Sequence, residues 1–299
     1  MTAGFPRRKG VFAMKFVLSA FSDEASPDFV KQLEALKRNQ ISNLEIRGVN
    51  GKSIHQQTNE ELAVVKKQME EYGVGLSAIG SAIGKISIED DFAPHVEDFK
   101  RVMEIAHILG TDNIRMFSFF LPKGKDPKNY RNEVLERLNT LLELSEKEGL
   151  YCCHENEKEI YGDTKERCLD LFSVFGGRLH GIFDPANFIQ CGEDPASIID
   201  ELLPHMHYMH IKDAKKASGA VVPCGYGDGS IPLLLQKFNQ DEGECFLTVE
   251  PHLTVFDGLS GLQDEELKHE FTYPSGDAAF DAACQAVRDI LKNGNFNFR

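Results

Sequence analysis

Short apolar segments alternate with longer segments in which apolar residues recur at helical spacing along almost the whole chain. Residues 15–21 form a β-rich run, whereas 28–38 has the period of an amphipathic helix. Glycine ends several helical segments, as Gly73 does after residues 60–72. The pattern predicts strands at 15–21, 43–47, 74–79, 113–117, 150–155, 179–184, 207–211 and 245–250. It predicts helices at 28–38, 60–72, 96–109, 130–148, 164–175, 195–203, 232–239 and 277–291.

Eight strand–helix cycles in one chain predict an α/β fold, a single closed (β/α)8 TIM barrel. The competing architecture is an open doubly wound sheet, which favours a glycine-rich phosphate turn after an early strand. Here Phe21-Ser22-Asp23-Glu24 follows the first strand instead. We therefore expect one catalytic barrel domain over 14–299. Residues 1–13 are expected to be a disordered N-terminal extension without the apolar core of a signal peptide.

Two connections are long for a barrel of this kind. Residues 80–94 follow the third predicted strand, and 251–276 follow the eighth. The second connection contains several large apolar side chains, including Phe256 and Phe271. Such a segment packs either against the barrel mouth or against another subunit. It is the candidate contact of a homo-oligomer.

Composition and charge limit the kinds of partner that we expect the protein to bind. The formal net charge of −14 and the even spread of Lys and Arg argue against binding of a nucleic acid. No apolar run reaches the roughly 18 residues of a membrane span. The seven Cys residues have no regular spacing and no C-x-x-C pair. This usage predicts reduced, mostly buried thiols in a cytoplasmic protein.

The chemistry is expected at the carboxyl ends of the strands, where parallel barrels carry their active sites. Glu155, Asp184, His210 and Glu250 stand at the ends of strands five to eight. Any one of them could be a solvated strand end or an ion-pair partner. Together, three carboxylates on one half of the rim would repel one another without a cation. The set predicts one divalent metal ion, manganese, magnesium or cobalt before zinc.

Several motifs resemble those of the sugar phosphate isomerase/epimerase superfamily, which has a xylose-isomerase-like TIM barrel. The matching segments are His154-Glu155-Asn156, Phe183-Asp184-Pro185-Ala186-Asn187, His210-Ile211-Lys212-Asp213, Val249-Glu250-Pro251, Leu44-Glu45-Ile46-Arg47 and Gly225-Tyr226-Gly227-Asp228-Gly229. The resemblance covers nearly the whole chain after Met14. The motif set is specific for the superfamily and does not separate its activities.

The resemblance implies a reaction at a metal that binds two adjacent oxygens of a hydroxy-carbonyl substrate. Glu155 and Glu250 are then catalytic as well as ligands, because one removes a proton from carbon and the other returns it. The implied activity is a divalent-metal-dependent isomerase or epimerase of a small sugar or related compound, by proton transfer through an enediolate. A metal-dependent lyase similar to inosose dehydratases is the alternative.

One position departs from the pattern of the epimerases. Asn187 stands where they usually carry a histidine that contacts substrate, and an amide cannot carry a proton. His154 and His252 are candidates to supply the missing group. Lys212 is expected to bind a substrate oxygen or to pair with a carboxylate. The full set of substrate-binding candidates is Glu45, His154, Asn187, Lys212 and His252.

Charged and imidazole side chains elsewhere have simpler interpretations. Glu45 and Arg47 alternate by two and form either an inner-rim ion pair or a substrate contact. Arg115 is expected to be an ion-pair partner inside the barrel. We expect His205 and His207 to be structural. Surface positions are expected for His55, His95, His107 and His269.

Two other classes of function agree less well with the sequence than an enzyme that acts on a small carbohydrate. Abasic-site endonucleases share the barrel, but they need several metal ions, more histidine ligands and a basic face, which the net charge of −14 opposes. A non-catalytic sugar-binding barrel has Asn187 as its only indication. Phosphate recognition is not expected, because Asp228 lies in the glycine-rich segment 225–229.

Overall fold

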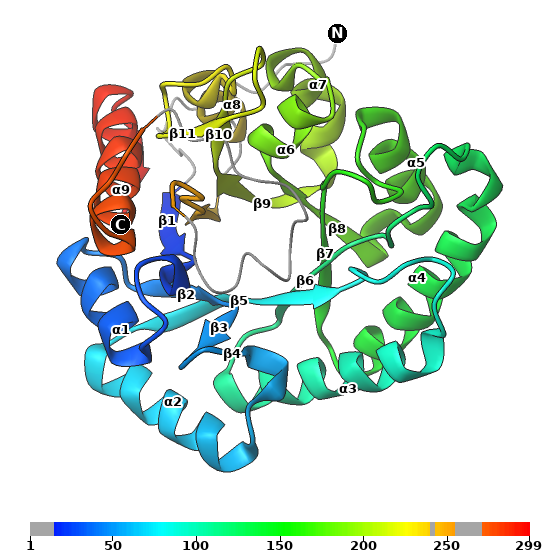
Figure 1. The fold of residues 1–299 in the computed structure, drawn as a ribbon, viewed down its shortest axis with the longest axis horizontal. Coiled ribbons are helices and arrows are strands. Elements are labelled where there is room, and N and C mark those ends of the chain that lie inside the picture. The colour runs from blue at the N-terminus through cyan, green and yellow to red at the C-terminus, as the bar shows by residue number, and fades with distance from the viewer. Residues whose placement is uncertain (1–14, 240–242, 255–270) are drawn as a thin grey trace, which may run out of the picture.

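The computed structural model describes residues 15–239, 243–254 and 271–299, and parallel strands form a closed barrel at its centre (Figure 1). Around the barrel the strands are β1 (Lys15–Ala20), β2 (Asn43–Ile46), β5 (Gly75–Ile83), β6 (Asn113–Met116), β7 (Tyr151–Glu155), β8 (Leu179–Phe183), β9 (Met206–Ile211) and β12 (Glu244–Val249). The barrel closes where β12 pairs with β1, from Lys15 opposite Glu244 to Ala20 opposite Val249. The predicted (β/α)8 architecture is confirmed.

Helices surround the strands as an outer ring (Figure 1). They are α1 (Phe29–Arg38), α2 (Asn59–Tyr72), α3 (Phe92–Leu109), α4 (Arg131–Lys147), α5 (Lys165–Phe175), α6 (Pro185–Gln190), α7 (Pro195–Leu202), α8 (Ile231–Phe238) and α9 (Gly276–Asn293). Every predicted helix is present. The short α6 was not predicted, and it places Asn187 directly above the end of β8.

Local signals in the sequence set the helix ends. Thr58 and Glu61 form a capping box at the start of α2, which satisfies two backbone N–H groups that the first turn leaves without partners. Gly73 ends the same helix with φ of 68°, a left-handed conformation that a side chain disfavours. These caps explain why the bounds of α2 follow the predicted helix over 60–72 closely.

Short elements complete the chain. Two antiparallel pairs are β3 (Gly48–Val49) with β4 (Lys52–Ser53), and β10 (Asp213–Ala214) with β11 (Val221–Val222). Near the C-terminus β13 (Asn297–Phe298) pairs with β1 at Lys15 and Phe16. It does so because β2 meets β1 only at Ser19 and Ala20, which leaves the start of β1 open on that side. In the described part of the chain, 3-10 turns lie at Ser22–Glu24, Ile54–Gln56, Pro127–Asn129, Gly176–Arg178 and Leu203–His205.

Two sequence predictions near β5 are wrong. The strand continues to Ile83, so the connection predicted over 80–94 is partly strand and α3 already begins at Phe92. His95 is buried, with 7% of its surface exposed, although a surface position was predicted. Its Nε2 accepts a 2.7 Å hydrogen bond from the Gly84 N–H, so the imidazole satisfies the backbone where β5 ends.

Parts of two predicted segments lie outside the described residues. These are the proposed extension over 1–13 and most of the connection over 251–276, of which 255–270 are not described. At the end of that connection, the Phe271 ring meets the Tyr226 ring edge-on, with centroids 5.4 Å apart. His269 also lies outside the described residues.

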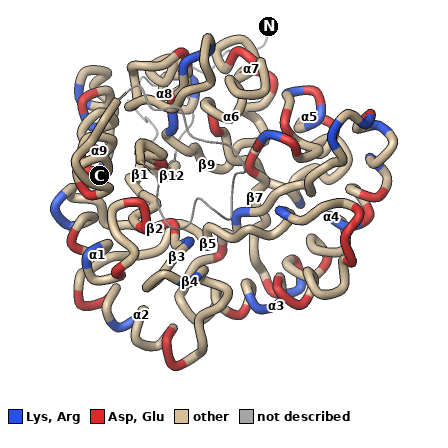
Figure 2. Tube along the Cα trace, viewed as in Figure 1, with Lys and Arg blue, Asp and Glu red and all other residues tan. Residues whose placement is uncertain are grey.

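Charges of both signs alternate around the outer helices. Figure 2 shows Lys and Arg interspersed with Asp and Glu along the ring. Among the described helices, none combines the length and the apolar content that crossing a bilayer requires.

The cysteine thiols are free and mostly buried, as predicted. Six of the seven are buried, and Cys191 is half-buried. Burial raises the pKa of the Cys152 thiol and of the Cys245 thiol to about 12. These thiols are therefore protonated, and weak nucleophiles, at neutral pH.

We expect the folded protein to react slowly with Ellman's reagent at mildly alkaline pH, because only a thiolate attacks the reagent. Cys191 is expected to react first, since it is the most accessible thiol. Denaturant should make all seven thiols react rapidly. Fast modification of the buried thiols in the folded protein would contradict this packing.

Candidate metal centre

Four side chains from four adjacent strands meet at one end of the barrel. Glu155 is the last residue of β7, Asp184 directly follows β8, His210 lies near the end of β9, and Glu250 directly follows β12. Their possible ligand atoms lie within 4.8 Å of one another, and all four residues are buried. The structure brings together the four residues that the sequence selects as a metal site.

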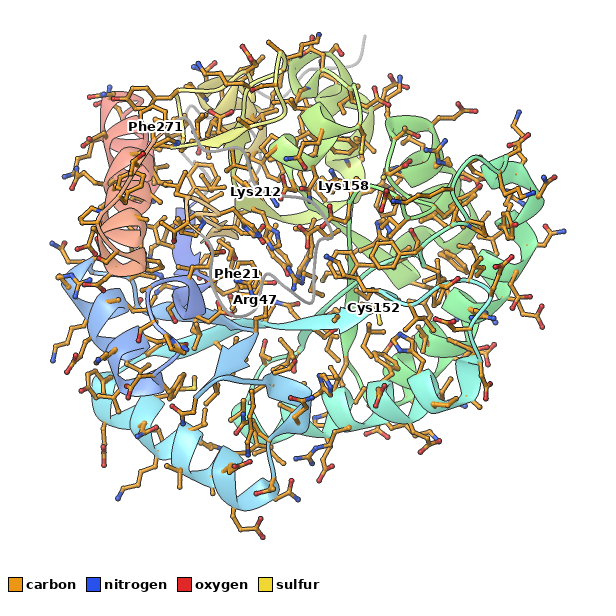
Figure 3. The ribbon with its side chains drawn as sticks, in the orientation of Figure 1. Phe21, Arg47, Cys152, Lys158, Lys212 and Phe271 are labelled. Atoms are coloured by element: carbon orange, nitrogen blue, oxygen red, sulfur yellow. The ribbon has the colours of Figure 1, made fainter. Side chains whose placement is uncertain are left out.

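His210 and Lys212 link the carboxylates of this group. The His210 Nδ1 atom lies 3.1 Å from Glu155 Oε1 and 3.4 Å from Glu250 Oε2. The Lys212 Nζ atom lies 2.8 Å from Asp184 Oδ2 and 3.2 Å from Glu250 Oε2. Figure 3 shows Lys212 inside the ring of strands. The expected ion pair of Lys212 with neighbouring carboxylates is therefore present.

Burial and neighbouring charges shift the pKa values of the three carboxyl groups in different directions. Burial disfavours ionisation of Glu155, yet His210 and Arg115 lower its pKa to about 2. Burial likewise opposes ionisation of Glu250, but chiefly Lys212 holds its pKa well below the usual range. Burial raises the pKa of Asp184 to about 7 against the attraction of Lys212. Two of the carboxylates are thus anionic at neutral pH. Additional positive charge in the site would favour ionisation of the third, Asp184.

The donor set fits a divalent cation. Carboxylate oxygens and one imidazole nitrogen converge in a buried site, where like charges repel one another more strongly than in water. Oxygen-rich sets of this kind suit manganese, magnesium or cobalt, and zinc also binds carboxylates and histidine. The four residues could therefore hold a metal ion.

Two arginines border the same carboxylates. The Arg115 Nη1 atom lies 3.1 Å from Glu155 Oε2, which confirms the predicted ion pair inside the barrel. The Arg47 guanidinium lies 2.9 Å from Asp23 and 3.5 Å from Glu250. It also stacks 4.4 Å from the centre of the Phe21 ring. Both cations compensate charge that the buried carboxylates carry.

Glu45 contacts the candidate ligand His210. It is fully buried, and its Oε2 lies 3.1 Å from His210 Nε2. Its other oxygen accepts a 3.1 Å hydrogen bond from the Tyr208 hydroxyl. The sequence suggested Arg47 or a substrate as its partner, whereas its recorded partners come from β9 on another side of the barrel.

Asn187 is placed beside Glu155 by the short helix α6. Its Nδ2 donates to Glu155 Oε1 at 3.3 Å and to the Asn156 carbonyl at 2.9 Å. Its backbone N–H donates to Asp184 Oδ1 at 2.9 Å, which caps the helix. The Oδ1 atom of Asn187 is buried without a hydrogen-bond partner among the described residues. It is thus an acceptor available to a hydroxyl group.

His252 lies beside Glu250 and contacts a residue that the sequence did not single out. Its Nδ1 lies 3.4 Å from Glu250 Oε1 and 3.3 Å from Glu24 Oε1. The Glu24 carboxylate also accepts the His252 backbone N–H at 2.6 Å. Burial raises the pKa of Glu24 to about 8. Glu24 lies in the 3-10 turn Ser22–Glu24 after β1, and its contact with His252 joins residues 228 positions apart, so no local pattern of the sequence identifies it.

A second rim pair was also missed. The Lys85 Nζ atom lies 3.1 Å from Glu157 Oε2 and 4.3 Å from the centre of the Phe117 ring. Lys85 follows β5, and Glu157 follows β7 by two residues. The sequence did not place Lys85 at the end of a strand, because the end of β5 was predicted four residues too early.

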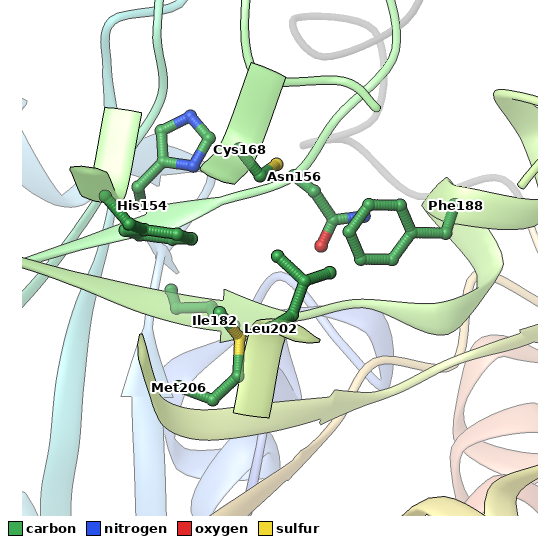
Figure 4. Close-up of a pocket in the computed structure, with 8 residues that line it drawn as sticks. His154, Asn156, Cys168, Ile182, Phe188, Leu202 and Met206 are labelled. Atoms are coloured by element: carbon green, nitrogen blue, oxygen red, sulfur yellow. The ribbon is translucent and has the colours of Figure 1, made fainter. Parts of the chain in front are cut away.

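His154 does not join the other candidates. It precedes Glu155 on β7, and neighbouring residues of a strand point to opposite faces. The ring therefore faces the helices, where it lines a small pocket with Cys168 and Phe172 (Figure 4). Its Nε2 lies 2.9 Å from Ser118 Oγ. Burial lowers its pKa to about 4, so the ring is neutral at neutral pH. The structure therefore does not bring His154 together with the other candidate residues.

The glycine-rich segment 225–229 wraps around a carboxylate of the chain itself. Asp213 accepts the backbone N–H groups of Gly225, Gly227 and Gly229 at 2.9, 3.1 and 2.8 Å. A Cβ atom at Gly227 would collide with the Asp213 carboxylate, and one at Gly229 would lie 2.7 Å from its Oδ1. Because Asp213 takes these N–H groups, they are not presented to a phosphate, in line with the sequence interpretation.

The chain belongs to the xylose isomerase-like TIM barrel family. Residues 39–265, three quarters of the sequence, match the sequence profile of that family. The match agrees with the resemblance that the strand-end motifs indicate.

Individual relatives are distant and differ in activity. The curated 3-dehydroshikimate dehydratase of Bacillus anthracis is 21% identical over 213 residues, which are 68% of this chain and 76% of the relative. A D-allulose 3-epimerase from Methylomonas sp. superimposes with a TM-score of 0.70 at 14% identity, covering 94% of this chain and 100% of that structure. The IOLI protein with a bound zinc atom gives a TM-score of 0.70 at 13% identity, covering 94% and 99%. At these identities the structural matches establish the fold.

We expect Gly227→Ala to lower the free energy of unfolding by about 1–3 kcal/mol, the usual cost of forcing a methyl group into a packed site. The added Cβ would collide with the Asp213 carboxylate. Chemical denaturation measures the loss. Gly177→Ala is the matched control, because nothing lies within 4 Å of the Cβ it adds. Equal stability of the two variants would contradict the wrapped carboxylate.

Proposed function

We propose that the protein is a divalent-metal-dependent isomerase or epimerase that acts on a small sugar or a related hydroxy-carbonyl compound. The convergence of Glu155, Asp184, His210 and Glu250 within 4.8 Å carries the proposal. In it, these four residues hold one ion, for which manganese, magnesium, cobalt and zinc are candidates. The family and its epimerase-like structural neighbours agree with this class of chemistry.

Glu155 and Glu250 are the proposed proton carriers. When bound, the ion would polarise the substrate carbonyl and make the neighbouring C–H more acidic. Both glutamates lie beside the proposed ion, and an ionised carboxylate can accept a proton. One removes the proton from carbon and the other returns it. Return to the opposite face gives an epimer, and return to the neighbouring carbon gives an aldose–ketose pair.

Each proposed proton carrier keeps cations beside it. Arg115 lies 3.1 Å from Glu155, whereas Lys212 and Arg47 lie 3.2 and 3.5 Å from Glu250. The charge of each carboxylate is thus balanced from outside the set of four ligands. This arrangement compensates the buried charge of each carboxylate while it is ionised.

Asn187, Lys212 and His252 are the proposed substrate contacts. The buried Oδ1 of Asn187 can accept a hydrogen bond from a substrate hydroxyl, which offsets the cost of an unsatisfied buried acceptor. The Lys212 ammonium lies between Asp184 and Glu250 and can donate to a substrate oxygen. An amide at position 187 can orient a hydroxyl but cannot transfer its proton.

A metal-dependent lyase on the same site is the second candidate. The observation that favours it is the similarity to a 3-dehydroshikimate dehydratase over 68% of the chain. Such a reaction also begins with removal of a proton next to a carbonyl, but a β-hydroxyl then leaves. Lys212 is a cation within 3.2 Å of Glu250 and could assist that departure.

The proposed partner is a small-molecule carbohydrate. A cytoplasmic location and a homo-oligomer stay predictions. The connection predicted to make the oligomer contact lies largely outside the described residues.

Deuterium exchange tests the proton transfer. With manganese and a panel of ketoses and inososes in D₂O, we expect deuterium to enter the carbon next to the carbonyl of the true substrate. Glu155→Gln and Glu250→Gln should lower the exchange rate by about 10²–10⁴-fold, because an amide is not a base. Glu34→Gln, on the exposed face of α1, is the matched control and should keep the wild-type rate.

The same experiment separates the two candidates. A conjugated product that absorbs in the ultraviolet would favour the lyase over the isomerase or epimerase. Absence of both exchange and such a product with every carbonyl substrate tested would contradict proton transfer at this site.

Metal binding is a separate prediction. We expect elemental analysis to find one divalent ion per chain, and His210→Ala to weaken its binding at least about tenfold, because that variant lacks the only nitrogen donor of the four ligands. A chelator should abolish exchange in the wild type, and manganese should restore it. Unchanged metal content in His210→Ala would show that the four-residue assignment is wrong.

A further inference from the structure

The two ring nitrogens of His210 face different carboxylates. Nδ1 faces the candidate ligands, 3.1 Å from Glu155 Oε1 and 3.4 Å from Glu250 Oε2. Nε2 faces away from them, 3.1 Å from Glu45 Oε2. His210 and Glu45 are both fully buried. The imidazole is therefore held between the proposed metal ligands on one side and a single carboxylate on the other.

Glu45 reaches this position from a strand that is not a neighbour of β9. In the barrel order, β2 is separated from β9 by β5, β6, β7 and β8 in one direction, and by β1 and β12 in the other. Tyr208, two residues before His210, donates its hydroxyl to the second Glu45 oxygen at 3.1 Å. One carboxylate thus holds two side chains of the same face of β9.

Aromatic contacts restrict the rotation of the imidazole. The Phe21 ring meets the His210 ring edge-on, with centroids 5.2 Å apart and an angle of 83° between their planes. The Tyr208 ring lies 5.6 Å from it on another side. Two aromatic rings thus pack against the imidazole, beside its contacts with Glu45 and Glu155.

The hydrogen bond to Glu45 determines which nitrogen carries a proton. A carboxylate only accepts, so the atom that faces Glu45 must be an N–H. Nδ1 faces Glu155 and Glu250 in the same way, so an ion that binds there must replace its proton, and the one N–H of the neutral imidazole then lies on Nε2. Histidines that bind metals commonly donate their second N–H in this way, which fixes the tautomer and makes the ligand nitrogen more basic.

We propose that Glu45 is a positioning residue that keeps the His210 proton on Nε2, so that Nδ1 is presented to the metal ion. This inference rests on the proposed metal centre and assigns Glu45 a role other than substrate binding. It predicts that Glu45 acts through His210, on the affinity for the ion and on the tautomer, without touching the substrate.

The test is made on the full chain loaded with zinc, a diamagnetic ion. In protein labelled with ¹⁵N-histidine, long-range ¹H–¹⁵N spectra report which nitrogen carries the proton, and the His210→Asn variant identifies the His210 signals. We expect the proton of wild-type His210 on Nε2 and the zinc on Nδ1. Zinc on Nε2 would overturn the inference without need of any Glu45 variant.

A pair of variants measures the effect on affinity. Glu45→Gln should weaken zinc binding about 10–100-fold in a competition titration with a fluorescent chelator, since loss of such a partner costs this much in other metal sites. Its Nε2–H signal should weaken or be lost. Tyr208→Phe is the matched control, because it removes the other hydrogen bond of Glu45 and leaves the contact with His210. It should keep the tautomer and lose much less affinity.

The outcomes separate this inference from the metal centre itself. Wild-type zinc affinity and an unchanged Nε2–H signal in Glu45→Gln would overturn the role of Glu45 alone, provided that His210→Ala weakens binding. If the wild type binds no divalent ion, or if His210→Ala binds as tightly as the wild type, the metal centre fails and the role of Glu45 fails with it.

Discussion

Burial of several carboxylates at one end of the barrel is the constraint on which the site depends. Glu155, Asp184 and Glu250 are almost fully buried, and an uncompensated ion in such a place costs several kcal/mol. The protein meets this cost with cations drawn from other strands, Arg115 at 3.1 Å from Glu155 and Lys212 at 2.8 Å from Asp184. A divalent ion between the same carboxylates would add to this compensation.

The closed barrel makes such a concentration of charge possible. Four adjacent parallel strands end at the same rim, so one residue at each end is enough to build the group of four. Contacts with other side chains then orient these residues. Arg115 and Asn187 adjoin Glu155, and Glu45 adjoins the far side of His210. The proposed proton transfer and the proposed metal binding both depend on this orientation.

The sequence could predict the barrel and the four converging residues, because both follow from local patterns. Strand and helix periods are local, and Glu155 or Glu250 needs only its place at a strand end. The alternation of a strand already separates His154 from Glu155, and the structure keeps it apart from the other candidate residues. Glu24 and the partner of Glu45 were missed. Their contacts join segments more than 160 residues apart, with separations of 228 and 165 residues.

Anomalous scattering from a crystal of the manganese-soaked protein tests the central claim most directly. The account predicts one strong peak per chain, within bonding distance of Glu155, Asp184, His210 Nδ1 and Glu250. A second buried group, formed by Glu24, Glu250 and His252, offers an alternative position close by. A peak between those residues, or no peak inside the barrel, would contradict the four-residue metal centre.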